Sequence, residues 1–142
     1  MKPVQLIALF AENKLGQMSR ITQVLADEGV NIRWVTFATS ERFGVIKLLV
    51  DQTDVAFRAL EKQGWTVSLV EVLALEVPDK PGGLHEIIDC LTRHGVNVEN
   101  SSGYVANNRA VVLIEVKDVV SARKILTREK FHLLSQDEML KL

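Results

Sequence analysis

The chain has 142 residues and a formal net charge of −1; 47% of its residues are hydrophobic and 25% are charged. These values are typical of a globular protein with one domain or two small ones. They argue against a nucleic-acid partner, because that affinity depends on neutralising phosphates with a basic surface. The longest apolar stretch, residues 67–77, contains Ser68, Glu71 and Glu76 and is too short to span a membrane.

The amino-terminal residues and the cysteine content indicate a cellular compartment. Residues 1–4 lack the apolar segment of a signal peptide, which favours the cytoplasm. The single cysteine, Cys90, cannot form an internal disulfide and fits a reducing compartment. We therefore expect a cytoplasmic protein with no membrane partner.

Apolar runs and helical spacing predict six elements in the first half of the chain. Strands are expected at residues 5–11, 32–38, 45–50 and 65–70, and a helix is expected in each of the intervals 17–28 and 53–63. Gly29 is placed as the C-cap of the first helix, and Thr53 or Asp54 as the N-cap of the second. The alternation of polar and apolar residues changes parity within residues 32–37, which indicates a β-bulge.

The second half predicts the same order of elements. Strands are expected at residues 73–77, 98–105, 110–116 and 131–134, and helices at residues 83–94 and 119–128. Asn107 and Asn108 are expected to form a turn. No Gly, Pro or Asn interrupts residues 69–77, so the last strand of the first half should run almost directly into the first strand of the second.

Two motifs recur at one spacing without a gap. Asp79–Leu84 follows Asn13–Met18 by 66 residues (79 − 13 = 66), and Gly95–Val98 follows Gly29–Ile32 by the same distance. The chain is therefore a tandem duplication, with residues 1–70 and 71–142 as the expected repeats. Each repeat has the order β-α-β-β-α-β, which predicts the α+β class and a ferredoxin-like fold. In that fold a four-stranded antiparallel sheet carries both helices on one face.

The recurring motifs resemble those of ACT domains, small-molecule-sensing modules that regulate amino-acid metabolism. The resemblance covers essentially the whole chain and is most specific in the second copy, since Asn13 and Leu15 stand where the family favours Asp and Pro. It implies a ligand bound between two domains, near the glycine loop and the second strand of the repeat. The ligand-binding residues that it implies are Asn13, Gly16, Met18, Asn31 and Ile32 in the first copy, and Asp79, Gly82, Leu84, Asn97 and Val98 in the second.

The chemistry of the motif suits an α-amino acid. A glycine after the first strand lets backbone N–H groups approach a ligand, and the following helix N-terminus attracts a carboxylate. The asparagine before the second strand offers both a donor and an acceptor. The apolar residues near these positions, Met18, Ile32, Trp34, Leu84 and Val98, weakly favour a branched-chain or aromatic ligand.

A purely structural reading stays open for each of these residues. The glycines could serve only as turn residues and caps, and Asn31 and Asn97 could be present for backbone reasons after a helix end. Met18 and Leu84 could belong to the core, and Trp34 and Tyr104 could pack on the sheets rather than line a ligand cleft.

No set of residues in the sequence predicts catalysis, a cofactor or a metal site. His85 and His94 lie nine residues apart, about 180° around one helix, so they cannot share a metal ion. Cys90 lies on an apolar stripe and is expected to be a small buried hydrophobe. Nucleotide-binding and nucleophile motifs do not occur.

The sequence thus predicts a non-catalytic allosteric regulator that binds a free amino acid at the interface of two ACT repeats. Such a sensor is expected to act as a homodimer or on a partner enzyme. The alternative is a regulatory or structural subunit of a biosynthetic enzyme that works mainly through a protein interface. An enzyme with an unrecognised site is a third possibility.

Overall fold

The computed structural model describes residues 2–142, and none of the helices there is long and apolar enough to cross a membrane. The chain forms two compact units, Gln5–Val70 and Glu71–Leu142, the second of which includes the amino-terminal residues up to Val4. The elements are β1 (Val4–Glu12), α1 (Gln17–Asp27), β2 (Ile32–Ser40), β3 (Phe43–Val50), α2 (Thr53–Lys62), β4 (Thr66–Val77), α3 (Gly83–Arg93), β5 (Asn100–Ala106), β6 (Arg109–Glu115), α4 (Val119–Arg128) and α5 (Gln136–Leu140).

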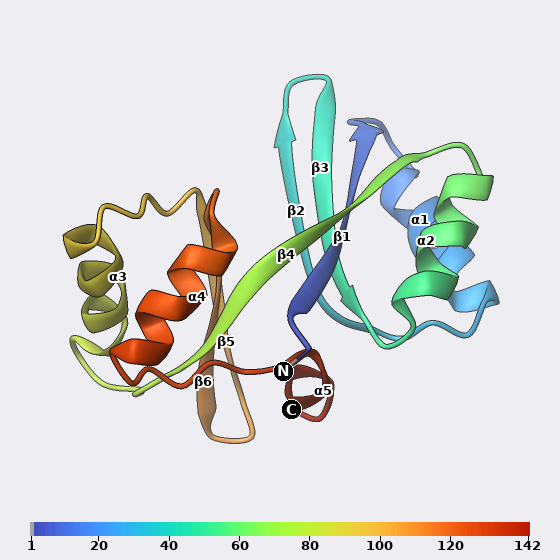
Figure 1. The fold of residues 1–142 in the computed structure, drawn as a ribbon. Helices are drawn as coiled ribbons and strands as arrows, with labels where there is room; N and C mark the ends of the chain where they lie inside the picture. The colour runs from blue at the N-terminus through green and yellow to red at the C-terminus, as the bar shows by residue number, and fades with distance from the viewer. Residues whose placement is uncertain (1) are drawn as a thin grey trace. The chain divides into compact units, whose positions relative to one another are not determined.

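The first unit is an antiparallel sheet with the strand order β2-β3-β1-β4 and two helices, α1 and α2, side by side on one face (Figure 1). Alternate residues of β1 and β3 point to this face, because side chains along a strand alternate between its two sides. The buried core between sheet and helices contains Ile7, Leu9, Ala11, Ile21, Leu25, Val30, Ile46, Leu48, Val50, Ala56 and Leu60.

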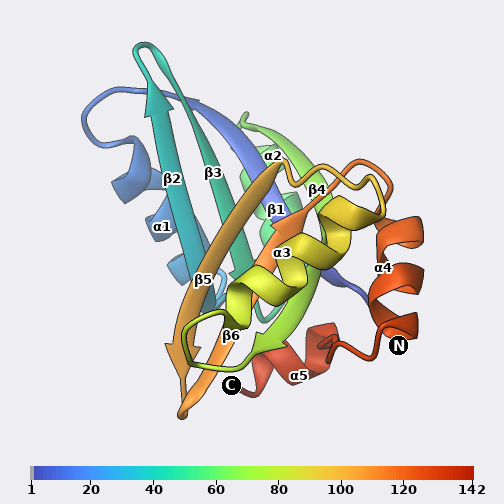
Figure 2. The same cartoon turned by 90° about the vertical axis from the view of Figure 1, so that its left-hand side faces the viewer.

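The second unit repeats this arrangement with the strand order β4-β6-β5 and the helices α3 and α4 (Figure 2). Its core contains Leu73, Leu75, Ile87, Cys90, Leu91, Val112, Ile114, Val116, Ala122 and Leu126. Most of these residues follow a core residue of the first unit by 66 positions, as Leu73 follows Ile7 and Leu126 follows Leu60. The predicted α+β class with two ferredoxin-like repeats is confirmed.

Strand β4 serves both units. It runs from Thr66 to Val77 as one twelve-residue strand, so that the last strand of the first repeat continues as the first strand of the second. The predicted absence of a linker is confirmed. Residues Leu73–Val77 pair with β6 without a shift of register.

The predicted last strand at residues 131–134 is wrong as a regular strand. Only a single bridge joins Leu133 to Leu75, flanked by hydrogen bonds from Glu76 N to His132 O and from Leu134 N to Ala74 O. The chain then turns into α5, which was not predicted. This short helix begins with a capping box, because Ser135 Oγ accepts from Glu138 N and a Glu138 carboxylate oxygen accepts from Ser135 N.

Local details confirm some expectations and correct others. The bulge in β2 lies between Ile32 and Trp34, and the turn at Asn107 and Asn108 has positive φ at both residues. The cap of α2 was placed wrongly: the N-cap is Gln52, and no side chain caps this helix. Strand β5 begins at Asn100, two residues later than expected.

Candidate functional site

The two glycine loops end in the same backbone geometry. Gly16 has φ 91° and Gly82 has φ 85°, and each is the N-cap of the helix that follows, α1 or α3. This left-handed conformation favours glycine over any residue with a side chain. The first N–H group of each helix bonds within its loop, from Gln17 N to Lys14 O over 3.3 Å and from Gly83 N to Lys80 O over 3.1 Å. No side chain caps either helix, so the other N–H groups of each first turn have no side-chain acceptor.

The first loop is held against the turn between β2 and β3. Asn13 N donates to Arg42 O over 2.7 Å, and Asn13 Nδ2 donates to Glu41 O over 2.9 Å. A cavity of about 360 Å³ lies here, lined by Asn13, Lys14, Phe43 and neighbouring residues. The Asn13 side chain thus helps to fix the loop with one of its two amide hydrogens.

The second loop passes close to its own helix. A Cβ atom on Gly83 would lie 2.1 Å from the carbonyl oxygen of Pro78, so only glycine fits at this position. The next residue, Leu84, is 46% exposed and lines a largely apolar cavity of about 440 Å³ on β5 and β6. Tyr104 lines the same cavity, and its hydroxyl lies 4.0 Å from Met139 Sδ in α5.

The two asparagines have different surroundings. Asn31 N donates to Asp51 Oδ1 over 2.9 Å, and Asp51 N donates back to Asn31 O over 3.1 Å. Both bonds at Asn31 involve its backbone rather than its side-chain amide. Asn31 and Asn97 are both exposed, and Asn97 lines a polar cavity of about 360 Å³ together with Lys117 and Asp118.

The structure does not bring the glycine loop and the asparagine of one repeat together. Strands β1 and β2 both run antiparallel to β3, so they are parallel to each other. The loop follows the end of β1, whereas Asn31 precedes the start of β2, at the opposite end of the sheet. Nine residues of strand separate these ends by roughly 25 Å, at about 3.3 Å per residue. The second repeat has the same order of strands.

The apolar residues of the candidate site contribute to the cores. Met18 and Ile32 pack partly buried against the core of the first unit, and Val98 packs against that of the second. Asp79, between β4 and α3, is exposed. Leu84 lines the apolar cavity on β5 and β6.

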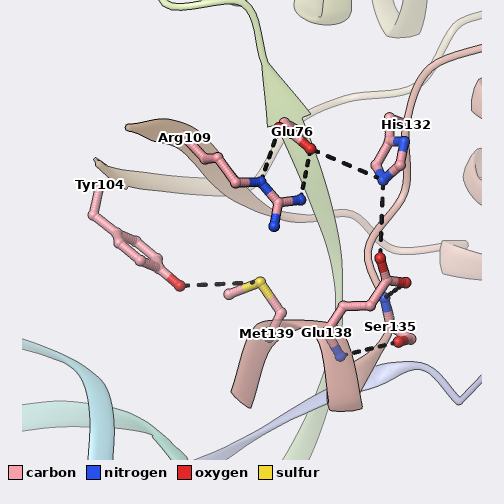
Figure 3. Close-up of polar contacts among 7 residues, drawn as sticks. All are labelled: Glu76, Tyr104, Arg109, His132, Ser135, Glu138 and Met139. Atoms are coloured by element: carbon pink, nitrogen blue, oxygen red, sulfur yellow. Dashed lines mark hydrogen bonds and ion pairs between the residues drawn. The ribbon is translucent and has the colours of Figure 1, made fainter. Parts of the chain in front are cut away.

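A polar cluster that sequence reasoning missed joins the carboxyl-terminal segment to the second sheet (Figure 3). Arg109 binds both carboxylate oxygens of Glu76, with distances of 3.0 and 2.7 Å, and these bonds lower the pKa of Glu76. His132 Nε2 lies 3.9 Å from carboxylate oxygens of both Glu76 and Glu138. The hydrogen bonds of the Ser135 capping box lower the pKa of Glu138.

The members of this cluster connect β4 and β6 to the start of α5 through ion pairs and hydrogen bonds. The sequence did contain one signal for it, the Ser-x-x-Glu spacing of residues 135–138.

Cys90 and His94, the other side chains whose chemistry could serve a site, are buried or bonded within the second unit. Cys90 is fully buried in the second core, as expected, and burial raises the pKa of its thiol. His94 Nδ1 lies 2.8 Å from Cys90 O. Within residues 2–142, no three His, Cys, Asp or Glu side chains are placed to hold a metal ion together.

Two ferredoxin-like units with a glycine loop at the start of the first helix of each define an ACT-type regulatory fold. The family model of the ACT domain pair matches residues 2–142. The chain therefore belongs to the ACT domain pair family.

Solved structures show the same fold. Protein BT0572 from Bacteroides thetaiotaomicron matches with a TM-score of 0.92 and 28% sequence identity, over 99% of this chain and 97% of that one. The ligand-free regulatory subunit of aspartate kinase from Thermus thermophilus matches with a TM-score of 0.62 and 15% identity, over 92% of this chain and 94% of that one. The corresponding subunit from Thermus flavus matches with a TM-score of 0.57 and 16% identity, over 90% and 93%. Comparison with curated protein sequences gave no match.

Proposed function

We propose that this ACT domain pair is a cytoplasmic, non-catalytic sensor that binds a free amino acid and regulates amino-acid metabolism by an allosteric change. The observation that carries the proposal is the repeated loop. Gly16 and Gly82 each place a left-handed residue at the start of an eleven-residue helix without a side-chain cap. The N–H groups and the partial positive charge of such a helix end attract a carboxylate.

The geometry of one repeat limits which of the candidate residues a single ligand can contact. Because the glycine loop and the asparagine lie at opposite ends of a sheet, one amino acid cannot contact both within a single repeat. We expect the loop of one repeat to bind the ligand carboxylate and the asparagine end of another repeat to bind the ammonium. Two repeats, from the same chain or from two chains of a homodimer, then contribute to one site. A ligand bound in this way favours one arrangement of the repeats, which is a shift of population.

A second function, as a subunit that acts through a protein interface, has its own support. Strand β2 is an edge strand of the first unit, and Val35 and Phe37 on it are each 44% exposed. Exposed apolar side chains on an edge strand favour pairing with another chain. The Thermus proteins of the same fold are regulatory subunits of aspartate kinase, which makes a partner enzyme a reasonable class to test.

A thermal-shift screen of the protein against the twenty standard amino acids, followed by calorimetry, tests the sensor. An amino acid present at 100 times its Kd should stabilise the protein by about 2.7 kcal/mol, or roughly 5–10 °C. We expect one clear hit and a loss of its binding in Gly82→Val, because valine cannot adopt the left-handed conformation without distorting the loop.

The control is Gly64→Val, which introduces the same backbone strain after α2 at a residue outside the candidate ligand-binding set. It should lower stability and leave the affinity unchanged. If none of the twenty amino acids shifts the unfolding temperature, the sensor is refuted and the interface function is favoured. A pull-down from cell extract with Phe37→Ser as the comparison variant would then identify a partner.

A further inference from the structure

The apolar cavity of the second repeat adjoins the glycine loop on both sides. Val77 is the last residue of β4 before the loop, Leu84 is the second residue of α3 after it, and both line the cavity. Residues 101–105 of β5 and 110–112 of β6 form the rest of its lining. Its volume of about 440 Å³ falls in the range of small-molecule sites, about 300–1,000 Å³. Every lining residue is uncharged, so the cavity suits an apolar group.

The glycine in the middle of β5, Gly103, is not required by the strand itself. Strands β5 and β6 pair without a shift of register from Asn100 to Ala106, so the glycine does not mark a bulge. Its φ lies outside the left-handed region, and a Cβ atom there would lie 3.3 Å from Val111 O, a contact that a small shift relieves. A glycine inside a strand weakens the strand, and one without a local backbone role marks a place where a ligand approaches closely.

The first repeat holds an aromatic ring at the matched position. Phe37 precedes Gly103 by 66 residues, and the strand pairing agrees, because Phe37 lies opposite Ile46 and Gly103 lies opposite Val112. Ile46 and Val112 belong to the two cores, so both positions are on the face of the sheet that carries the helices. The two repeats therefore differ at this position by a whole phenyl ring.

The ring of Phe37 occupies space that the second repeat leaves open. A Cβ atom on Gly44 would lie 2.6 Å from Phe37 Cε2, so this glycine makes room for the ring. The residue matched to Gly44 is Ala110, whose methyl group is much smaller than a phenyl ring. The first repeat thus fills with its own side chain the place that is a cavity in the second. A ligand ring has to lie slightly farther from β6 than the Phe37 ring lies from β3, because the Ala110 methyl group takes part of the space.

We infer that the apolar cavity receives the aromatic ring of the ligand and that Gly103 is the residue that determines this specificity. The inference rests on the proposed sensor function, since a carboxylate bound at the Gly82 loop places the rest of the molecule beside Leu84. The ligand class is then a carboxylate with an aryl side chain, and its expected source is an aromatic amino acid.

The test measures selectivity in the wild-type protein and then fills the cavity. Calorimetry compares phenylalanine, tyrosine and tryptophan with leucine, isoleucine and alanine, and with 3-phenylpropanoate, which is phenylalanine without its ammonium group. The double variant Gly103→Phe/Ala110→Gly installs the pair that the first repeat already holds in the same register. The matched control is Asn100→Phe, which adds the same ring to β5 at an exposed residue that does not line the cavity. Circular dichroism verifies that each variant is folded.

We expect an aromatic amino acid to bind wild-type protein at least tenfold more tightly than any aliphatic one, because more apolar surface is buried. The double variant should weaken this binding by tenfold or more, and Asn100→Phe should leave it unchanged. Tighter binding of an aliphatic amino acid, or unchanged binding in the folded double variant, would overturn the inference while the sensor function stands. The wild-type comparison decides the matter even if the double variant unfolds.

The remaining outcomes separate the two proposals. Binding of 3-phenylpropanoate without binding of any amino acid would support the ring site and refute the sensing of amino acids. If none of the compounds with a ring binds, the inference is wrong, and the sensor function then depends on the rest of the twenty amino acids.

Discussion

Replacing Gly83 with alanine should destabilise the protein, although helix propensity predicts the opposite. Gly83 is the first residue of α3 and has an ordinary negative φ, so alanine would be favoured there by up to about 1 kcal/mol if space allowed. The new Cβ atom, however, would lie 2.1 Å from Pro78 O and 3.3 Å from Val77 Cγ1. A carbon and an oxygen that are not bonded normally stay more than 3 Å apart, so the loop has to move by about 1 Å.

The two effects can be compared in magnitude. Inserting a methyl group into a packed site costs typically about 1–3 kcal/mol, and the atom in the way here is backbone, which cannot rotate aside. After the gain in helix propensity, we expect a net loss of about 1–2 kcal/mol. For a chain of this size that corresponds to a fall of roughly 3–10 °C in the unfolding temperature.

Differential scanning calorimetry and urea unfolding measure this change. Gln17→Ala is the matched control, because residue 17 is the counterpart of Gly83 in the first repeat and already carries a side chain. A Gly83→Ala protein that unfolds at the wild-type temperature or above it would refute the reasoning. It would show that the second loop has room for a side chain and that Gly83 is not required for its close approach to Pro78.

Three further properties follow from the described structure. Gln17 is 8% exposed and its Oε1 has no hydrogen-bond partner, so Gln17→Leu should raise the free energy of unfolding by up to about 1 kcal/mol in urea; a decrease would mean that this oxygen is satisfied. Cys90 should react with a thiol reagent only as fast as the protein unfolds, since its thiol is buried and its pKa is raised; rapid labelling under native conditions would contradict this. The pKa of Glu76 is lowered from its ordinary value of 4.5, mainly by Arg109, so its contribution to stability is present above about pH 4.5 and is lost as the pH falls through the lowered value. Urea midpoints measured between pH 3 and pH 7 should therefore fall less steeply at the acidic end in Glu76→Gln than in wild type, and equal slopes would count against this ion pair.

Local patterns in the sequence account for most of the fold. The apolar residues of α1 and α3 recur at helical spacing, and the pairs Ile21/Ile87 and Leu25/Leu91 are buried in the corresponding cores. Such periodicity is visible in the sequence because it depends only on which face of one element is buried. The carboxyl-terminal segment was different. Residues 131–134 have the composition of a strand, and α5 is too short to show a helical stripe, so only its capping box could have revealed it.

The candidate site was less accessible to sequence reasoning. The repeated glycine loop and asparagine are evident in the sequence, but their separation to opposite ends of each sheet depends on strand directions. The difference between the two asparagine ends depends on single bonds, such as that from Asn31 N to Asp51 Oδ1. Residues 51 and 117 differ in the sequence, but only the structure shows the consequence of this difference, because it shows that Asp51 accepts a hydrogen bond from Asn31 N. Such contacts are tertiary, and no local pattern encodes them.

The shared strand β4 restricts how the gene could have been duplicated. In the first unit Trp65 and Val67 pack towards the core, and in the second Leu73 and Leu75 do so, all at odd-numbered positions. Leu73 and Leu75 are the copies of Ile7 and Leu9 in β1, and because the spacing of 66 is even they keep the odd parity that Trp65 and Val67 have earlier in β4. An odd spacing would have reversed the buried and exposed positions partway along the strand, and only a bulge or an inserted linker could have corrected it. Single-residue insertions between the two copies are therefore expected to be far less tolerated during evolution than insertions of two residues.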